Sequence, residues 1–251
     1  MPRLYTMNLV NWVYIVLSTA SVVVIYFSLR KKSTDSQYKW MFWMAVALDV
    51  IMIVHKIILT NLITHKWLTY IPLELCNICQ LILPFALYFR NEKLMSILFF
   101  IGVPCGIAAM LSPAPSLLGQ NFYQINVFCY FLTHMLQITL SLLPVIYQKF
   151  RLKWMYGLYA GIFLIAVGVT MHLINVILRT TGVAPNANYL ATFGEPRNPG
   201  ITFFFNLLPI PFVWQLPIAA VFIGVFFLEI YLFKLYYKKK DRVNHSETTT
   251  V

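Results

Sequence analysis

The residues with the greatest capacity for chemistry lie in the stretch IPLELCNICQ, residues 71–80, within otherwise apolar sequence. The stretch holds a thiol at Cys76, a carboxyl group at Glu74 and amides at Asn77 and Gln80. A cysteine attacks carbonyl carbons once a base or a positive environment has activated its thiolate. Polar groups are costly inside a membrane and mark functional sites by default. We therefore expect a reactive centre at Glu74 and Cys76, with Asn77 and Gln80 binding the substrate.

A base for this thiol is available at His134, in the block FLTHMLQ. A positioned histidine takes a proton from the nucleophile and returns it to the leaving group. Cys76, His134 and Glu74 are therefore the expected catalytic residues. His55 and Lys56 form a second ionisable pair within apolar sequence. They are expected to contact the substrate, with the Lys56 ammonium binding a lipid phosphate.

Amide and phenol groups complete the candidate site. Glu74 or Asn175 would orient the imidazole of His134, as the third member of a set of nucleophile, base and orienting group. Asn188 or Tyr189 would donate a hydrogen bond to the oxyanion of an acyl-transfer intermediate.

Each of these residues also has a simpler interpretation. A cysteine in a membrane helix often packs as a small apolar residue, and a histidine can bridge helices for a gain of about 1 kcal/mol. Lys56 could extend its ammonium to the membrane surface. Cys76 and Cys79 form a C-x-x-C pair, which keeps a membrane thiol oxidoreductase open. No H-x-x-x-H or comparable ligand pair occurs, so neither a metal nor another cofactor is expected.

The composition is that of a membrane protein. Of the 251 residues 60% are hydrophobic and 11% are charged, whereas soluble domains are about half apolar and about a quarter charged. The net charge of +11 comes mainly from short runs of Lys and Arg between apolar segments, as in cytoplasmic loops. No basic face is interleaved with exposed aromatic residues, so nucleic acid is not an expected partner. Membrane lipids are the expected partners.

Seven apolar stretches are long enough to cross a bilayer as helices of about 20 residues. They are expected at 9–29, 39–63, 71–89, 94–112, 125–147, 154–178 and 203–236. The sequence therefore predicts an all-α polytopic protein with a seven-helix transmembrane bundle. This bundle would form a single domain over residues 1–240, followed by a short disordered cytoplasmic tail over 241–251.

The distribution of charge predicts the orientation of the bundle. Most of the 19 Lys and Arg residues fall on one side if the N-terminus lies outside and the C-terminus inside, as the positive-inside rule requires. The predicted location is the plasma membrane, with multiple spans. In this topology the candidate site residues occupy the outer halves of their helices. We expect a polar cavity that opens outward beneath the loop over residues 179–200.

Helical geometry sets one condition on this site. Glu74 and Cys76 are two residues apart, which separates them by about 200° around an α-helix. Both can serve one site if the chain near Pro72 is not yet regular helix, or if the site wraps around the helix.

Four blocks of the sequence, taken in order, resemble a known family. They are IPLELCNIC, FLTHMLQ around His134, HLINVIL running to NANYL over 172–190, and LLPIPFVWQLP over 207–217. Their order and spacing are similar to those of the YwaF-like integral membrane proteins of bacteria, whose signature is of the LPLHLC type. The resemblance covers most of the chain.

This resemblance implies a seven-helix bundle, distantly related to a eukaryotic family of transmembrane lipid acyltransferases with a Cys/His site. The chain departs from the bacterial signature at Glu74, where that signature has histidine. Acyl transfer on a phospholipid or lysophospholipid is the first expected function. A non-enzymatic factor that binds or transports lipids or small molecules is the alternative, and thiol redox chemistry is the third.

Overall fold

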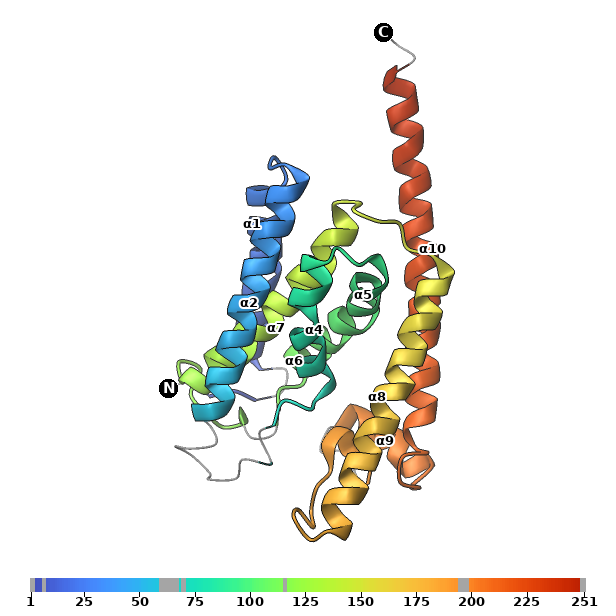
Figure 1. The fold of residues 1–251 in the computed structure, drawn as a ribbon. Helices are drawn as coiled ribbons and strands as arrows, with labels where there is room; N and C mark the ends of the chain where they lie inside the picture. The colour runs from blue at the N-terminus through green and yellow to red at the C-terminus, as the bar shows by residue number, and fades with distance from the viewer. Residues whose placement is uncertain are drawn as a thin grey trace.

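The computed structural model describes residues 3–5, 8–58, 68, 71–114, 117–193 and 199–248. Within these ranges the regular structure is helical apart from one isolated bridge between Arg3 and Asn121. Six helical runs are long and apolar enough to cross a membrane: Leu9–Leu29, Thr34–Ile58, Glu92–Leu111, Ile125–Ile146, Trp154–Thr180 and Gln215–Lys238. The chain is thus an all-α polytopic membrane protein (Figure 1).

The elements follow one another along the chain in this order: α1 (Leu9–Leu29), α2 (Thr34–Ile58), α4 (Leu75–Tyr88), α5 (Glu92–Ile97), the π-helix η2 (Leu98–Gly102), α6 (Val103–Leu111), α7 (Ile125–Ile146), α8 (Trp154–Thr180), the 3₁₀-helix η4 (Tyr189–Ala191), α9 (Pro199–Leu207) and α10 (Gln215–Thr248).

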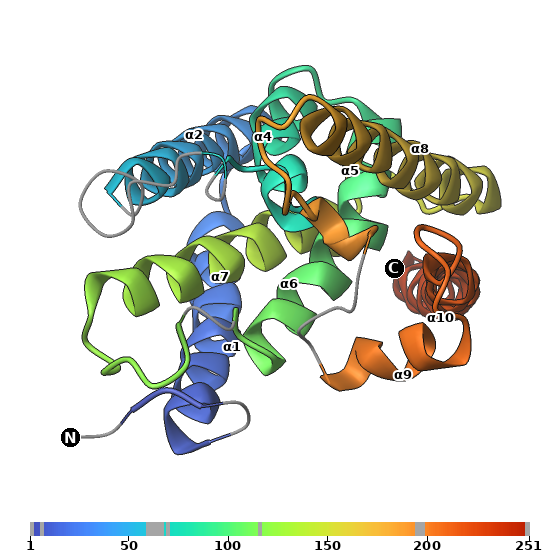
Figure 2. The same cartoon turned by 90° about the horizontal axis from the view of Figure 1, so that it is seen from below.

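Helix α7 lies inside the bundle and is the most deeply packed of the long helices. It contacts α1, α2, α4, α6 and η2, and most residues of its second half are buried. Helices α8 and α10 form a separate pair at the side of this group, joined to it mainly through α5 and η2 (Figure 2). The candidate site therefore depends on how α2 and α4 pack against α7.

Small residues allow α10 to approach α8 closely. A Cβ on Gly157 would lie 3.0 Å from Cδ1 of Ile230, and one on Gly161 would lie 3.3 Å from Ile223. Because lipid chains are as apolar as the side chains, helices in a membrane associate through close packing of this kind. Glycines one turn apart on α8 thus define its contact face toward α10.

The run from α5 to α6 contains a π-helical turn where other spans are plain α-helix. Pro104 follows η2 and has no backbone N–H, so it removes a helical hydrogen bond. The carbonyl of Gly102, the last residue of η2, accepts a hydrogen bond from Nε2 of Gln137 at 2.9 Å. The side chain of α7 thereby binds the backbone of the irregular turn, as is required inside a membrane.

Three expected spans differ from the structure in their bounds. The span expected at 71–89 contains α4, which has only 14 residues, because residues 71–74 are not helical. Among the residues that the structure describes, six helical runs therefore meet the length criterion for crossing, where seven were expected. The span expected at 39–63 begins earlier, at Thr34, and its residues 59–63 lie outside the described ranges.

The span expected at 203–236 is divided between α9 and α10. Pro209 and Pro211 lie between the two helices, where proline prevents a helix from continuing. Helix α10 then extends to Thr248. It therefore enters the segment 241–251, for which a disordered tail was expected.

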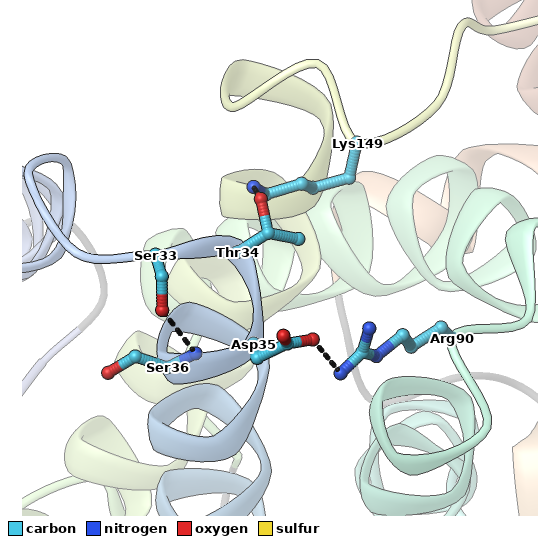
Figure 3. A network of polar contacts seen from close by, with 6 residues as sticks. All are labelled: Ser33, Thr34, Asp35, Ser36, Arg90 and Lys149. Carbon is cyan, nitrogen blue, oxygen red and sulfur yellow. Dashed lines mark hydrogen bonds and ion pairs between the residues drawn. The ribbon is translucent and has the colours of Figure 1, made fainter.

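The basic loops meet at one end of the bundle, called here the basic end. Asp35 at the start of α2 forms an ion pair of 2.6 Å with Arg90, which lies between α4 and α5. Lys149, between α7 and α8, donates a hydrogen bond of 2.9 Å to Oγ1 of Thr34 (Figure 3). Exposed contacts of this kind contribute only about 0–1 kcal/mol each. They nevertheless bring three separate basic runs together, as the charge pattern predicts; the side of the membrane that this end faces stays a prediction.

Candidate functional site

The start of α4 lies at the end of the bundle opposite the basic end (Figure 1). Glu74 is the N-cap residue of α4, with extended backbone angles of φ −71° and ψ 148°, and its carbonyl accepts a hydrogen bond from the Ile78 N–H at 3.0 Å. Regular helix thus begins only at Leu75. This meets the condition under which Glu74 and Cys76 can serve one site.

Lys56 is the charged residue around which the candidate site gathers. It lies in the last turn of α2, which packs against both α4 and α7. Its ammonium interacts electrostatically with Glu74 and Cys76 at the start of α4 and with His134 on α7. Four of the expected residues, Lys56, Glu74, Cys76 and His134, are therefore brought into one group, called here the Lys56 cluster.

The sulfur of Cys76 faces the N-terminus of its own helix. It lies against the backbone N–H groups of Asn77 and of Cys76 itself, in the first turn of α4. The N-terminus of a helix carries a partial positive charge. Burial opposes negative charge on the sulfur most strongly and the Glu74 carboxylate opposes it as well, while the Lys56 ammonium and this end of α4 favour it.

The imidazole of His134 is fixed in one orientation and one tautomer. It is 3% exposed, and its Nδ1 lies 2.7 Å from the carbonyl oxygen of Tyr130, one turn earlier in α7. A carbonyl can only accept, so Nδ1 carries the proton and Nε2 presents a lone pair. Nε2 is buried without a hydrogen-bond partner. The ring centroids of His134 and Tyr130 are 4.3 Å apart, and the Tyr130 hydroxyl donates to the carbonyl of Ala109 at 3.1 Å.

His134 and Cys76 do not form a direct hydrogen bond. Nδ1 of His134 is bound to Tyr130, and Nε2 has no partner. The two residues share Lys56 as an electrostatic neighbour. A thiol–imidazole pair is therefore not preformed, although both groups belong to the same cluster.

Gln80 contacts a neighbouring helix one turn beyond Cys76. Its Nε2 donates to Oε1 of Gln137 on α7 at 2.8 Å, and both side chains are fully buried. Asn77 is also buried on α4. Gln80 thereby joins α4 to α7 beneath the cluster.

Asn175 holds the loop that follows α8. Its Nδ2 donates to the carbonyl of Tyr189 at 2.9 Å and to Oγ1 of Thr192 at 2.8 Å, and its Oδ1 accepts from the Tyr189 N–H at 2.9 Å. Asn188 fixes the same loop, because its Oδ1 accepts from the Phe193 N–H at 2.9 Å. The Asn175 amide thus makes its bonds to the loop and none to His134, which removes it from the expected role of orienting that ring.

Tyr189 connects this loop to the cluster. Its hydroxyl donates to the carbonyl of Leu68, and its side chain interacts electrostatically with Glu74. The loop over 188–193 also receives a hydrogen bond from the indole of Trp214, which donates to the carbonyl of Ala191 at 3.2 Å. Tyr189 therefore lies at the rim of the Lys56 cluster. Its loop is held in place by Asn175 of α8 and by Trp214, which precedes α10.

His55 lies at the edge of the cluster, where it interacts electrostatically with Lys56, its neighbour in the sequence. Its ring is buried next to the side chain of Asn126, in the first turn of α7. The Nε2 atom of His55 and the Oδ1 atom of Asn126 both lack a hydrogen-bond partner.

The four cysteines are free thiols. Cys76 and Cys79 on α4 and Cys105 on α6 are close enough to interact electrostatically. Cys129 lies on α7 outside this group. Among the residues that the structure describes, no group of three or more His, Cys, Asp or Glu side chains is arranged to hold a metal ion.

Two residues of the site were not expected from the sequence. Tyr130 supplies the carbonyl that fixes His134, and Gln137 binds both Gln80 and the π-helix. They lie four residues before and three residues after His134, the spacing at which residues share one face of a helix. This spacing was the signal that could have identified them.

A comparison with protein-family models identifies the family. The model described as the TMEM164 family matches residues 4–236. The chain belongs to the TMEM164 family. No curated protein and no solved structure gives a significant match. The part shared with the TMEM164 family includes the whole Lys56 cluster and the loop held by Asn175.

Proposed function

We propose that this TMEM164-family protein transfers an acyl group between a phospholipid and a lysophospholipid at the Lys56 cluster. The observation that carries the proposal is the imidazole of His134, whose Nε2 lone pair is presented in the same cluster as the Cys76 thiol. We place the protein in the plasma membrane, with the cluster at the outward-facing end in a polar cavity.

The reaction proceeds in two steps. Nε2 of His134 takes the thiol proton of Cys76, and the sulfur attacks the ester carbonyl carbon of the donor lipid. The ester C–O bond breaks, and the leaving alcohol of the lysolipid takes its proton from His134. A thioester remains on Cys76. In the second step the hydroxyl of an acceptor lysolipid gives its proton to His134, attacks the thioester and releases the thiol.

The remaining residues of the site bind the lipid and the developing charge. Lys56 contributes a cation for the phosphate of the headgroup. The hydroxyl of Tyr189 would donate to the oxyanion after releasing its bond to the carbonyl of Leu68. Glu74 balances the Lys56 charge. Asn77 and Gln80 follow the thiol on α4, and binding of the ester between Cys76 and His134 would bridge two groups that do not contact each other directly.

The resemblance to YwaF-like proteins, and through them to lipid acyltransferases with a Cys/His site, supports the same reaction.

A second function is favoured by a specific observation. His134 and Cys76 are not hydrogen-bonded, and Glu74 stands where the bacterial signature has histidine. These features suit a non-enzymatic protein that binds or moves a lipid through its headgroup. A thiol oxidoreductase would instead have to oxidise Cys76 together with Cys79 or Cys105.

Two measurements on protein purified in mild detergent without reductant separate these functions. The first is the intact mass of wild type, Cys76→Ser and Cys129→Ser, where Cys129 is the matched control on α7. The second is transfer of a labelled acyl chain from a phospholipid to an added lysophospholipid, for the same proteins and for His134→Ala.

Acyl transfer predicts a fatty-acyl mass that is lost in Cys76→Ser and kept in Cys129→Ser. It also predicts that His134→Ala lowers the transfer rate by about 10²–10⁴-fold, the usual contribution of a general base. Full transfer activity in Cys76→Ser would refute the proposed mechanism. A loss of two hydrogens that Cys76→Ser abolishes would indicate a disulfide, and an unmodified, inactive protein that still binds lysophospholipid would indicate the binding function.

A further inference from the structure

Polar atoms without hydrogen-bond partners recur along the buried face of α7. Nε2 of His134 and Oγ of Ser141 belong to α7, and Oε1 of Gln80 lies against it through the bond to Gln137. These three side chains are 3%, 2% and 0% exposed. His134, Gln137 and Ser141 are spaced by three and four residues, so they lie on one face of α7. Gln80 of α4 contacts this face through its bond to Gln137.

The same face continues to the start of the helix. Asn126 and His55 are each 8% exposed and each carries a polar atom without a partner. From Asn126 to Ser141 the rise along α7 is about 22 Å, which is most of the about 30 Å hydrocarbon thickness of a bilayer. The unpartnered atoms therefore extend from the end with the Lys56 cluster deep into the bundle.

Atoms of this kind are costly if nothing binds them. A buried polar group without a partner costs about 1–3 kcal/mol, and the cost recurs at each of these positions. The imidazole Nε2 and the amide Oε1 are acceptors, while the Ser141 hydroxyl both donates and accepts. Water can form hydrogen bonds with both the acceptors and the hydroxyl, because it offers two donors and two acceptors and normally makes about three hydrogen bonds when buried.

Gly102 lets two polar side chains of α7 pack closely against the backbone of η2 at the deep end of this face. A Cβ at Gly102 would lie 3.0 Å from Oγ of Ser141 and 3.6 Å from Nε2 of Gln137. The absence of a side chain there permits this close approach of two polar groups to the π-helical backbone of η2. An alanine at this position would press a methyl group against the hydroxyl of Ser141 and cover it.

We propose that a chain of water molecules occupies the buried face of α7 from Asn126 to Ser141, called here the α7 water path. It passes His134 and Gln80 and ends beside Gly102. Because Nε2 of His134 lies on the path, this atom can exchange a proton with water as well as with a bound substrate. The path goes beyond acyl transfer and does not require it, because it depends only on groups that are buried in the resting protein.

Hydroxyl-radical labelling by X-ray radiolysis of the full chain in lipid nanodiscs tests the path, since radicals formed from bound water modify the side chains that contact it. In the wild type the matched pair is His134 and Phe131, both buried on α7 at 3% and 1% exposure. A second pair uses the variants Ser141→Cys and Leu140→Cys, which place a reactive thiol at nearly the same depth in the membrane. The first thiol lies on the polar face of α7, and the second lies on its apolar face. The blocking variant is Gly102→Ala in the Ser141→Cys protein, and its control is Gly224→Ala, where a Cβ meets no atom within 4 Å.

The α7 water path predicts labelling of His134 and of the Ser141→Cys thiol well above Phe131 and the Leu140→Cys thiol. Gly102→Ala should reduce labelling of the Ser141→Cys thiol to the level of Leu140→Cys, and Gly224→Ala should leave it unchanged. Equal labelling of the two members of either pair overturns the path. Neither pair contains Gly102→Ala, so this test remains valid even if that variant fails to fold. Full acyl transfer in Cys76→Ser would refute the proposed function and leave the α7 water path untouched, so the two failures are distinguishable.

Discussion

Replacing Asn175 with alanine tests how the loop over 188–193 is held next to the Lys56 cluster. Asn175 is fully buried and makes three hydrogen bonds of 2.8–2.9 Å to Tyr189 and Thr192. Hydrogen bonds between neutral groups contribute about 0.5–1.5 kcal/mol each in soluble proteins, and those in membrane proteins average about 0.6 kcal/mol. Three such bonds give an expected loss of about 2–4 kcal/mol.

The loss can be measured as a shift of the apparent melting temperature in detergent, followed by tryptophan fluorescence. Trp214 is a suitable reporter, because its indole binds the carbonyl of Ala191 in the same loop. For a chain of this length, about 2–4 kcal/mol corresponds to a decrease of about 5–15 °C. In a protein that unfolds irreversibly the comparison must use one scan rate for every variant.

Asn11→Ala is the matched control for this prediction. Asn11 is also fully buried, but its amide makes a single long-range hydrogen bond, from Nδ2 to the carbonyl of Met110 at 2.6 Å. Its replacement should lower the melting temperature by about one third as much as Asn175→Ala. A shift in Asn175→Ala no larger than that in Asn11→Ala would refute the reasoning that the three loop bonds act together.

Two further predictions concern the packing of α7. Gly106→Ala places a methyl group 2.6 Å from Cγ1 of Ile138 and should destabilise the protein by about 1–3 kcal/mol through overpacking; Ile138→Val should restore part of the melting temperature, and no restoration would contradict the contact. Gln137→Leu leaves the amide of Gln80 without its acceptor and should cost about 1–3 kcal/mol. The double variant Gln80→Leu with Gln137→Leu should lose less than the two single losses combined, so strictly additive melting shifts would contradict the pairing.

The length and position of the long helices could be predicted from sequence because they depend on local properties. A helix must satisfy its backbone hydrogen bonds within lipid, so an apolar run of sufficient length identifies it. The runs at 9–29 and 125–147 match α1 and α7 closely. Elsewhere proline and polar residues made the helices shorter than the apolar runs predict. Helix α4 begins only after Pro72, and the last expected span is interrupted between α9 and α10.

The residues of the candidate site were identifiable by type, but their partners were not. Cys76, His134 and Lys56 are conspicuous in apolar sequence, and their spacing along the chain places them on three different helices. Nothing in those local patterns indicates that Lys56 would neighbour both of the others, or that Asn175 would bind a loop instead of His134.

The sequence by itself therefore determined which segments are helical, where the basic loops gather and which side chains could do chemistry. The tertiary structure alone decided which of these side chains meet. Contact between two helices depends on the rotation of each about its own axis, and that rotation is fixed by close packing at positions such as Gly106 against Ile138 and Gly157 against Ile230. Such packing is a property of pairs of residues far apart in the chain, so it cannot be predicted from the local pattern of either helix.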